Sequence, residues 1–149
     1  MRTYKDIVDI FTAATTAHIP TKTFAEGTLD YLDASSQNVA YPYMFLRPLS
    51  SPGLSLNTNT HTYTFELYSI DVPKLSDETP VQVKSRTELY IYDIVSYLRD
   101  GAQQQTLNCE LLAIAPVNEA FNDRAFGWVA TIQVSEPAVY NYCNFPDLP

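Results

Sequence analysis

Residues 60–71 read THTYTFELYSID, and this stretch decides the fold. Its side chains alternate in character with a period of two, and it is rich in aromatic and β-branched residues, which is typical of a β-strand. One predicted face carries Tyr63, Phe65, Leu67 and Ser69, and the other carries Thr62, Thr64, Glu66 and Tyr68. We therefore predict a strand over the whole of residues 60–71.

A second strand is predicted upstream, over residues 41–47 (YPYMFLR), with Pro42 near its start and Pro48 at its end. Proline lacks a backbone N–H group, so these positions favour an edge strand or a strand start. Residues 50–59 (SSPGLSLNTN) have the composition of an exposed loop. The two strands are thus expected to form an antiparallel hairpin with a long tip.

Downstream, an exposed loop over residues 72–78 leads to the clearest local pattern in the chain. Residues 79–82 (TPVQ) place a hydroxyl at the N-cap, proline at the first helical position and glutamine at the third, which is a capping box. The helix is predicted to run to about Asp100, and Gly101 is expected to take a positive φ just beyond it. The predicted inward stripe consists of Val83, Tyr90, Ile91, Ile94, Val95, Tyr97 and Leu98.

The rest of the chain adds one helix and two strands. Residues 3–18 have helical periodicity with Thr3 as a plausible N-cap, and Tyr4, Ile7, Val8, Phe11 and Ala14 fall on one stripe. Residues 24–38 are polar and irregular, with Phe24, Leu29 and Leu32 as expected anchors to the core. Strands are predicted over residues 107–114 and 126–135.

These elements define the expected fold. We predict an α+β class protein whose residues 1–137 form one domain, with element order α-β-β-α-β-β. The hairpins favour a four-stranded antiparallel sheet with the helices packed on one face. Residues 138–149 are expected to form an extended C-terminal tail, because prolines disfavour a helix there.

Composition limits the class of function. Charged residues make up 17% of the 149 residues, the net charge is −8, and there are 11 tyrosines. Soluble domains carry about 25% charge, so we expect partner chains to cover part of this surface, although a tyrosine-rich β core is the alternative. The acidic balance argues against affinity for nucleic acid, and it is compatible with a protein that surrounds DNA without gripping it.

The two cysteines, Cys109 and Cys143, show no CxxC pairing, and the N-terminus lacks the pattern of a secretory signal. Cytosolic synthesis with reduced thiols is therefore expected. A Cys109–Cys143 disulfide remains an open alternative. No apolar run approaches membrane-spanning length, so no membrane partner is expected.

The sequence offers no candidate catalytic, cofactor-binding or metal-binding residues. His18 is expected to be packed at a helix end, and His61 to be a solvated hairpin residue. The acidic pairs Asp77/Glu78 and Asp30/Asp33 are expected to be solvated loop charges. Phosphate-binding glycine motifs are absent. We predict that the protein is not an enzyme, while an apolar cavity for a small ligand stays open.

Two sets of apolar side chains remain after the core is assigned. Leu89 and Tyr92 fall outside the inward stripe of the second helix, near Ser85 and Ser96. The tail adds four more apolar residues, Val139, Tyr140, Tyr142 and Phe145. Exposed apolar groups on a helix suggest a contact patch, so all six are candidate interface residues. The alternative for Leu89 and Tyr92 is that a loop of the same chain covers them.

The sequence resembles a known family at several strings: YPYMFLRP (41–48), YTFELYSIDV (63–72), YLRDG (97–101) and FNDRAFGWVATIQVSEPAVYNYCNFP (121–146). It is similar to tail terminator and neck (head–tail joining) proteins of tailed bacteriophages, over about residues 4–146. The resemblance rests on the order of elements and on these strings. It provides no active-site residues.

The resemblance implies an α+β subunit with a four-stranded antiparallel sheet in a homo-oligomeric ring, usually a hexamer, in the virion tail or neck. Such a ring ends the tail tube and joins it to the neck or connector proteins, and DNA passes through its lumen without sequence-specific binding. Head–tail joining or other neck ring proteins share much of the fold and remain an alternative. A non-viral ligand-binding or accessory α+β domain is the second alternative.

Overall fold

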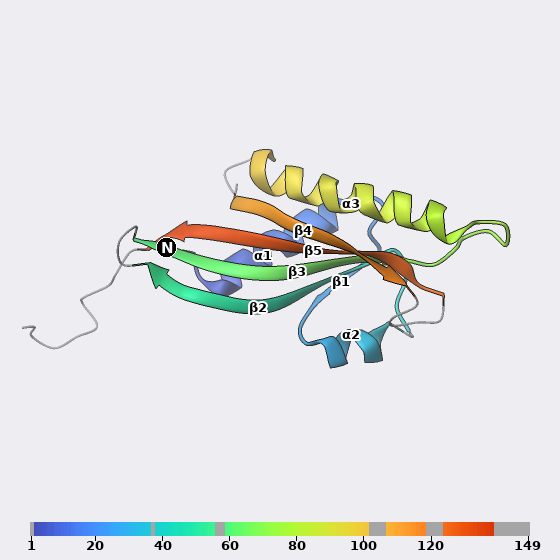
Figure 1. The fold of residues 1–149 in the computed structure, drawn as a ribbon, viewed down its shortest axis with the longest axis horizontal. Helices are drawn as coiled ribbons and strands as arrows, with labels where there is room; N and C mark the ends of the chain where they lie inside the picture. The colour runs from blue at the N-terminus through green and yellow to red at the C-terminus, as the bar shows by residue number, and fades with distance from the viewer. Residues whose placement is uncertain (1, 37, 56–58, 102–106, 119–123, 139–149) are drawn as a thin grey trace, which may run out of the picture.

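The computed structural model describes residues 2–36, 38–55, 59–101, 107–118 and 124–138 (Figure 1). It is an α+β fold, as predicted, with a mixed five-stranded sheet in the order β1-β2-β3-β5-β4. The helices are α1 (Tyr4–Ala17), α2 (Leu29–Ser35) and α3 (Pro80–Asp100). The strands are β1 (Thr23–Glu26), β2 (Tyr43–Ser55), β3 (Thr60–Asp71), β4 (Asn108–Asn118) and β5 (Phe126–Pro137).

The two predicted hairpins are present and lie next to each other. Strand β3 has the predicted bounds and pairs antiparallel with β2 on one side and β5 on the other. The pairing of β3 with β5 runs without a register shift from Thr60↔Pro137 to Asp71↔Phe126. Strand β4 completes the antiparallel part by pairing with β5.

The prediction of four strands is wrong by one element, because residues 24–38 are not irregular. Strand β1 pairs in parallel with the start of β2, from Thr23↔Tyr43 to Glu26↔Leu46. Helix α2 then follows a cap in which the hydroxyl of Thr28 accepts a hydrogen bond from the backbone N–H of Tyr31. Four residues of parallel strand have no local signature, since the pairing partner lies far along the sequence.

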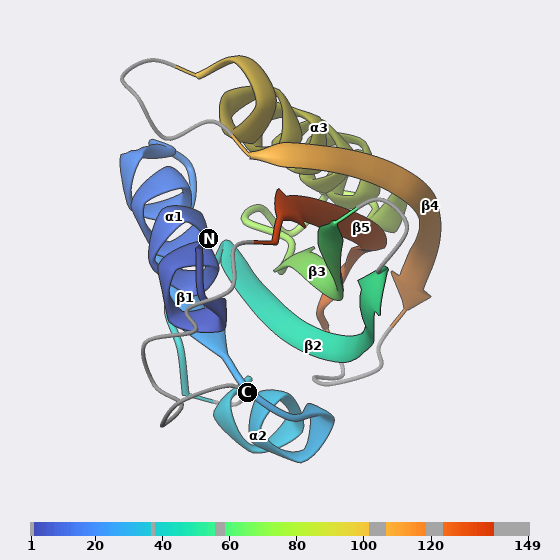
Figure 2. The same cartoon turned by 90° about the vertical axis from the view of Figure 1, so that its left-hand side faces the viewer.

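The prediction that the helices share one face is also wrong, because α2 packs on the face opposite α1 and α3 (Figure 2). Strand β2 explains how both faces are filled. Met44 and Leu46 point into the cluster beneath α1 and α3, while Tyr43 and Phe45 point into a second cluster with Leu32 of α2. Successive strand side chains alternate between faces, so four consecutive apolar residues can serve two cores.

Helix α1 begins as predicted. The Thr3 hydroxyl accepts from the backbone N–H of Asp6, and the Asp6 carboxylate accepts from the backbone N–H of Thr3. The buried side of α1 includes Ile7, Phe11 and Ala14, as expected, together with Ile10. Satisfying the free N–H groups at its first turn stabilises this helix by about 1 kcal/mol.

Three local expectations differ from the structure. Residues 50–59 are not all loop, because β2 continues to Ser55 with register shifts between Pro48 and Ser50 and between Ser50 and Gly53. Gly101 has φ −66° rather than a positive φ. Glycine is required there for space, since an added Cβ would lie 2.0 Å from the carbonyl oxygen of Tyr97. Tyr97 itself faces outward and is 43% exposed.

The close approach of β3 and β5 yields a stability prediction. A Cβ atom at Gly127 would lie 1.9 Å from the backbone oxygen of Ser69, and backbone cannot rotate away. We expect Gly127→Ala to lower the free energy of unfolding by about 3 kcal/mol, at the upper end of overpacking costs. Thr131→Ala on the same strand is the control and should change it by less than about 1 kcal/mol. Urea unfolding followed by circular dichroism measures both, and equal effects would contradict the close-approach explanation.

Candidate interaction surface

The outward side of α3 carries four uncharged, exposed residues at helical spacing, Ser85, Leu89, Tyr92 and Ser96, which we call the α3 strip. Leu89 is 61% exposed and Tyr92 is 40% exposed. Residues three and four positions apart lie next to each other on a helix, so the strip is continuous. The predicted outward orientation of Leu89 and Tyr92 is therefore observed, and their contact role remains a prediction.

A hydrogen bond fixes the phenol of Tyr92 beside the strip. Its hydroxyl donates to the Glu88 carboxylate over 3.1 Å, one helical turn earlier. This hydrogen bond, more than burial, raises the pKa of Tyr92 above its usual value. The phenol is neutral at physiological pH, as an unperturbed tyrosine also is.

Helix α3 is seated firmly, so the strip has a defined orientation. Its buried side includes Val83, Ile91 and Ile94, close to the predicted inward stripe. The indole N–H of Trp128 on β5 donates to the carbonyl oxygen of Lys84 over 2.9 Å. The predicted Thr79–Gln82 capping box is present at the first turn.

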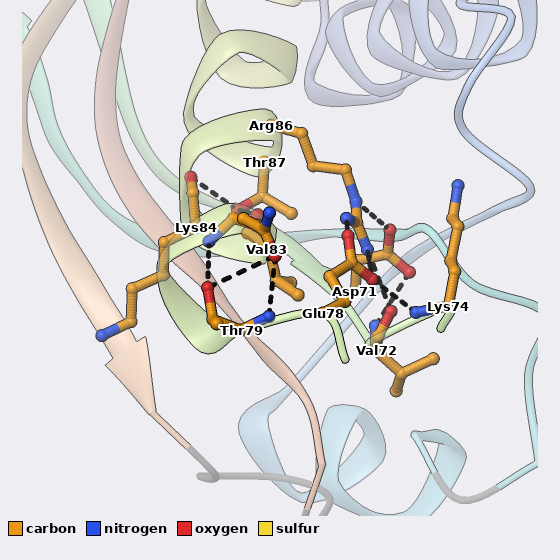
Figure 3. A network of polar contacts seen from close by, with 10 residues as sticks. Asp71, Val72, Lys74, Glu78, Thr79, Val83, Lys84, Arg86 and Thr87 are labelled. Atoms are coloured by element: carbon orange, nitrogen blue, oxygen red, sulfur yellow. Dashed lines mark hydrogen bonds and ion pairs between the residues drawn. The ribbon is translucent and has the colours of Figure 1, made fainter. Parts of the chain in front are cut away.

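A buried charge network ties the start of α3 to the end of β3 (Figure 3). The Arg86 guanidinium donates from Nε to Asp71 Oδ2 over 2.8 Å and from Nη2 to the Val72 carbonyl oxygen over 3.0 Å. Arg86 also forms an ion pair with Glu78. The second oxygen of Asp71 accepts from the N–H of Val72. The side chain of Asp71 is fully buried, and a buried carboxylate requires this kind of pairing.

The network corrects one expectation and provides contacts to the loop over residues 72–78. Glu78 is not a solvated loop charge, because its side chain is only 14% exposed and is bound by Arg86. Its carboxylate also accepts from the backbone N–H of Lys74. The loop over residues 72–78 is thus held at both ends, while Leu75 within it stays 69% exposed. Asp77 is exposed as predicted, whereas Asp30 and Asp33 are exposed on α2 rather than on a loop.

A groove of about 360 Å³ lies where the end of α1 meets α3. Its lining includes Ala14, Ala17, Pro20, Ile94 and Tyr97. His18 lies in this groove at the C-cap of α1, with Nδ1 2.7 Å from the Thr21 hydroxyl and Nε2 3.2 Å from Asp93 Oδ2. The packed role predicted for His18 agrees with these contacts. Sequence reasoning missed Ile19, which is 88% exposed at the groove, because no periodicity marks a residue beyond a helix end.

The described residues contain no group of three or more His, Cys, Asp or Glu side chains that could hold a metal ion. Burial raises the pKa of the Cys109 thiol, which lowers its reactivity. The ring of His61 lies against Tyr63, with 4.3 Å between ring centroids. Cys143 and the four candidate tail residues Val139, Tyr140, Tyr142 and Phe145 lie outside the described residues.

Comparison with known proteins adds no relative to this picture. No protein-family model matches the sequence, and a search of curated proteins gives no match. In the described part of the chain, no helix is both long enough and apolar enough to cross a membrane. What the geometry defines is an α+β domain with an uncharged helical strip on α3 and an apolar groove between α1 and α3.

The charge network yields a second stability prediction. Arg86→Met should lower the free energy of unfolding by about 3–5 kcal/mol, because it leaves the buried Asp71 carboxylate without a cation. Adding Asp71→Asn to Arg86→Met should recover part of the lost free energy of unfolding, since the double variant no longer buries an unpaired carboxylate. Equilibrium unfolding of the single and double variants measures this coupling. A double variant less stable than Arg86→Met alone would contradict the role assigned to the ion pair.

Proposed function

We propose that this protein is a structural subunit of a phage tail or neck, which assembles with copies of itself into a ring. The ring would end the tail tube and join it to the neck or connector proteins in the virion. The observation that carries the proposal is the α3 strip, an exposed uncharged surface on a firmly seated helix. The family resemblance of the sequence supplies the ring, its hexameric form and its place in the virion.

Electrostatics favours the strip as a contact between copies. A chain of net charge −8 repels its own copies, so self-contact is least costly through surfaces without charge. The strip has four uncharged residues, and Tyr92 is of the type that often dominates interface energy. Because α3 is already folded and packed in the subunit, its backbone loses little conformational entropy on contact.

The charge distribution fits a lumen through which DNA passes without being held. At least four of the cationic side chains, Arg2, Lys5, Arg47 and Arg86, are engaged by carboxylates of the same chain. Cations neutralised in this way contribute little to phosphate binding. An acidic wall repels the duplex and leaves it free to slide.

A head–tail joining or other neck ring protein is the alternative within the same class, because it requires the same kind of self-contact. A non-viral ligand-binding or accessory domain is the second candidate, and the groove between α1 and α3 favours it. Its volume of about 360 Å³ falls in the range of small-molecule sites. Thermal stabilisation by a panel of apolar small molecules, lost in Ala17→Trp, would favour this candidate.

The strip is tested by a double substitution. Leu89→Glu with Tyr92→Glu should shift the assembly to monomers, because buried carboxylates without partners oppose contact. Light scattering coupled to size-exclusion chromatography measures the mass, and circular dichroism checks that the fold is retained.

The chain offers a matched control in Leu75→Glu with Tyr31→Glu. These residues are 69% and 53% exposed, and they lie away from the strip. The control variant should assemble like the unmodified protein. If the strip variant assembles equally well, the strip is not an interface. If the unmodified protein is a monomer at all concentrations, the ring itself is wrong.

Binding to duplex DNA tests the lumen. The free protein should bind with a Kd weaker than about 10 µM at physiological salt. Fluorescence anisotropy of a labelled duplex at several salt concentrations measures it. Micromolar or tighter binding with a steep salt dependence would reveal a clustered basic face, and Lys74, Lys84 and Arg99 would be the residues to substitute first.

A further inference from the structure

Strand β4 is an edge strand with little of the usual protection. Among the described residues it pairs only with β5, so its outer row of N–H and C=O groups is open. Its one charged residue is Glu110, and residues 111–118 (LLAIAPVN) carry none. Leu112 is 49% exposed. An exposed, apolar edge strand is a template for pairing with another strand.

The opposite edge of the sheet is protected in ways that β4 is not. Strand β1 covers Tyr43 to Leu46 of β2, and the remainder of β2 contains Pro48 and Pro52, which have no N–H to donate. Two register shifts also interrupt that half of β2. Strand β4 has a single register shift, and its proline lies two residues from its end. Of the two outer strands among the described residues, β1 has 4 residues and β4 has 11, so β4 is the edge better suited to accept a strand.

The same chain supplies a suitable strand. Residues 139–145 (VYNYCNF) are uncharged, and four of the seven are β-branched or aromatic. Such residues favour strands. At about 3.3 Å per residue, seven residues span roughly 23 Å, which is enough to pair with most of β4 before Pro146 intervenes.

The exit direction of the chain decides whose β4 the tail can reach. The backbone N–H of Ala138 donates to the carbonyl oxygen of Asn59 over 2.7 Å, so the chain leaves β5 toward the start of β3. Strand β3 lies on the opposite side of β5 from β4. To reach its own β4 edge, the tail would have to reverse and cross over the end of β5 and the start of β4. Chain crossings of this kind are rare, whereas a neighbouring copy needs none.

We propose that residues 139–145 of one copy pair as an added strand with the outer edge of β4 of a neighbouring copy. This proposal rests on the self-assembly put forward above, and it names the second contact between copies. It also assigns Val139, Tyr140, Tyr142 and Phe145 to that contact. Main-chain hydrogen bonds would provide the affinity, and alternate side chains would contact the neighbour's exposed Leu112.

Cysteine cross-linking in the full chain tests the pairing, since Cys143 already lies within the tail segment. A new cysteine is placed on the edge in three separate variants, Glu110→Cys, Leu112→Cys and Ala113→Cys. A disulfide requires Cα atoms within about 7 Å, so only an adjacent strand can react. At least one variant should give a ladder of covalently joined chains on a non-reducing gel after mild oxidation and alkylation. Adding Cys143→Ser should abolish the ladder, and Leu75→Cys should give none.

Each other outcome overturns the proposal. A disulfide within one chain would place the tail on its own β4. A covalent dimer that survives Cys143→Ser would mean that β4 pairs with β4 of a second copy, because each chain then has a single cysteine on the edge. No cross-link in any variant, while light scattering shows that the chain assembles, would remove the strand exchange and leave the proposed ring intact. Monomeric protein without cross-links would contradict both the strand exchange and the proposed ring.

A second measurement uses Leu112→Lys, because a lysine is a common guard on edge strands. We expect this variant to require about a tenfold higher protein concentration for assembly. Leu75→Lys is the matched control. A labelled peptide of residues 138–149 should bind the full chain in competition with the native tails, and it should bind Leu112→Lys about tenfold more weakly. Equal assembly and equal peptide binding would overturn the proposal.

Discussion

Strand β3 pairs with β5 over its whole length and with β2 on its other side, and the other elements take their positions from it. Its alternating side chains enter both cores, with Phe65 and Leu67 beneath α1 and α3, and Tyr68 and Ile70 on the side of α2. Its last residue, Asp71, binds Arg86 and so fixes the start of α3. Register, both hydrophobic clusters and the orientation of the longest helix thus depend on one strand. A slip by one residue would exchange the two faces.

The surfaces proposed for contact lie on elements that are ordered for other reasons. Helix α3 packs against β3, β4 and β5 (Figure 1), and the residues of its strip are exposed. Strand β4 is paired along its inner row with β5, and none of the other described strands pairs with its outer row. A subunit of this kind can add to an assembly at little entropic cost.

Prediction from the sequence worked where the determining interactions are local. The alternation over residues 60–71 and the Thr79–Gln82 capping box each lie within a few residues, and both are observed. Strand β1 depends on pairing with Tyr43 to Leu46, which no local pattern encodes. The Thr28 cap of α2 was visible in the sequence, but seven helical residues among polar neighbours gave weak periodicity. The need for glycine at position 101 follows from crowding by the carbonyl oxygen of Tyr97, which is a property of the folded chain.

The side of α3 on which a residue lies was predictable for Leu89 and Tyr92, but the groove beside His18 was not. A groove forms between elements, and its shape depends on how α1 and α3 cross. The polar network around Arg86 was missed for the same reason, because Asp71 and Glu78 are brought together only by the turn between β3 and α3.

The burial of that network has a consequence for ionic strength. Dissolved salt screens charges that face water, within about 10 Å at 0.1 M, but it acts far less on a pair such as Arg86 and Asp71. Repulsion between subunits of net charge −8 acts through water and weakens as salt is added. The force that holds the subunit together and the force that keeps subunits apart therefore respond differently to the same ions. Moderate salt should weaken the repulsion between subunits while leaving the buried ion pair within each subunit nearly unchanged.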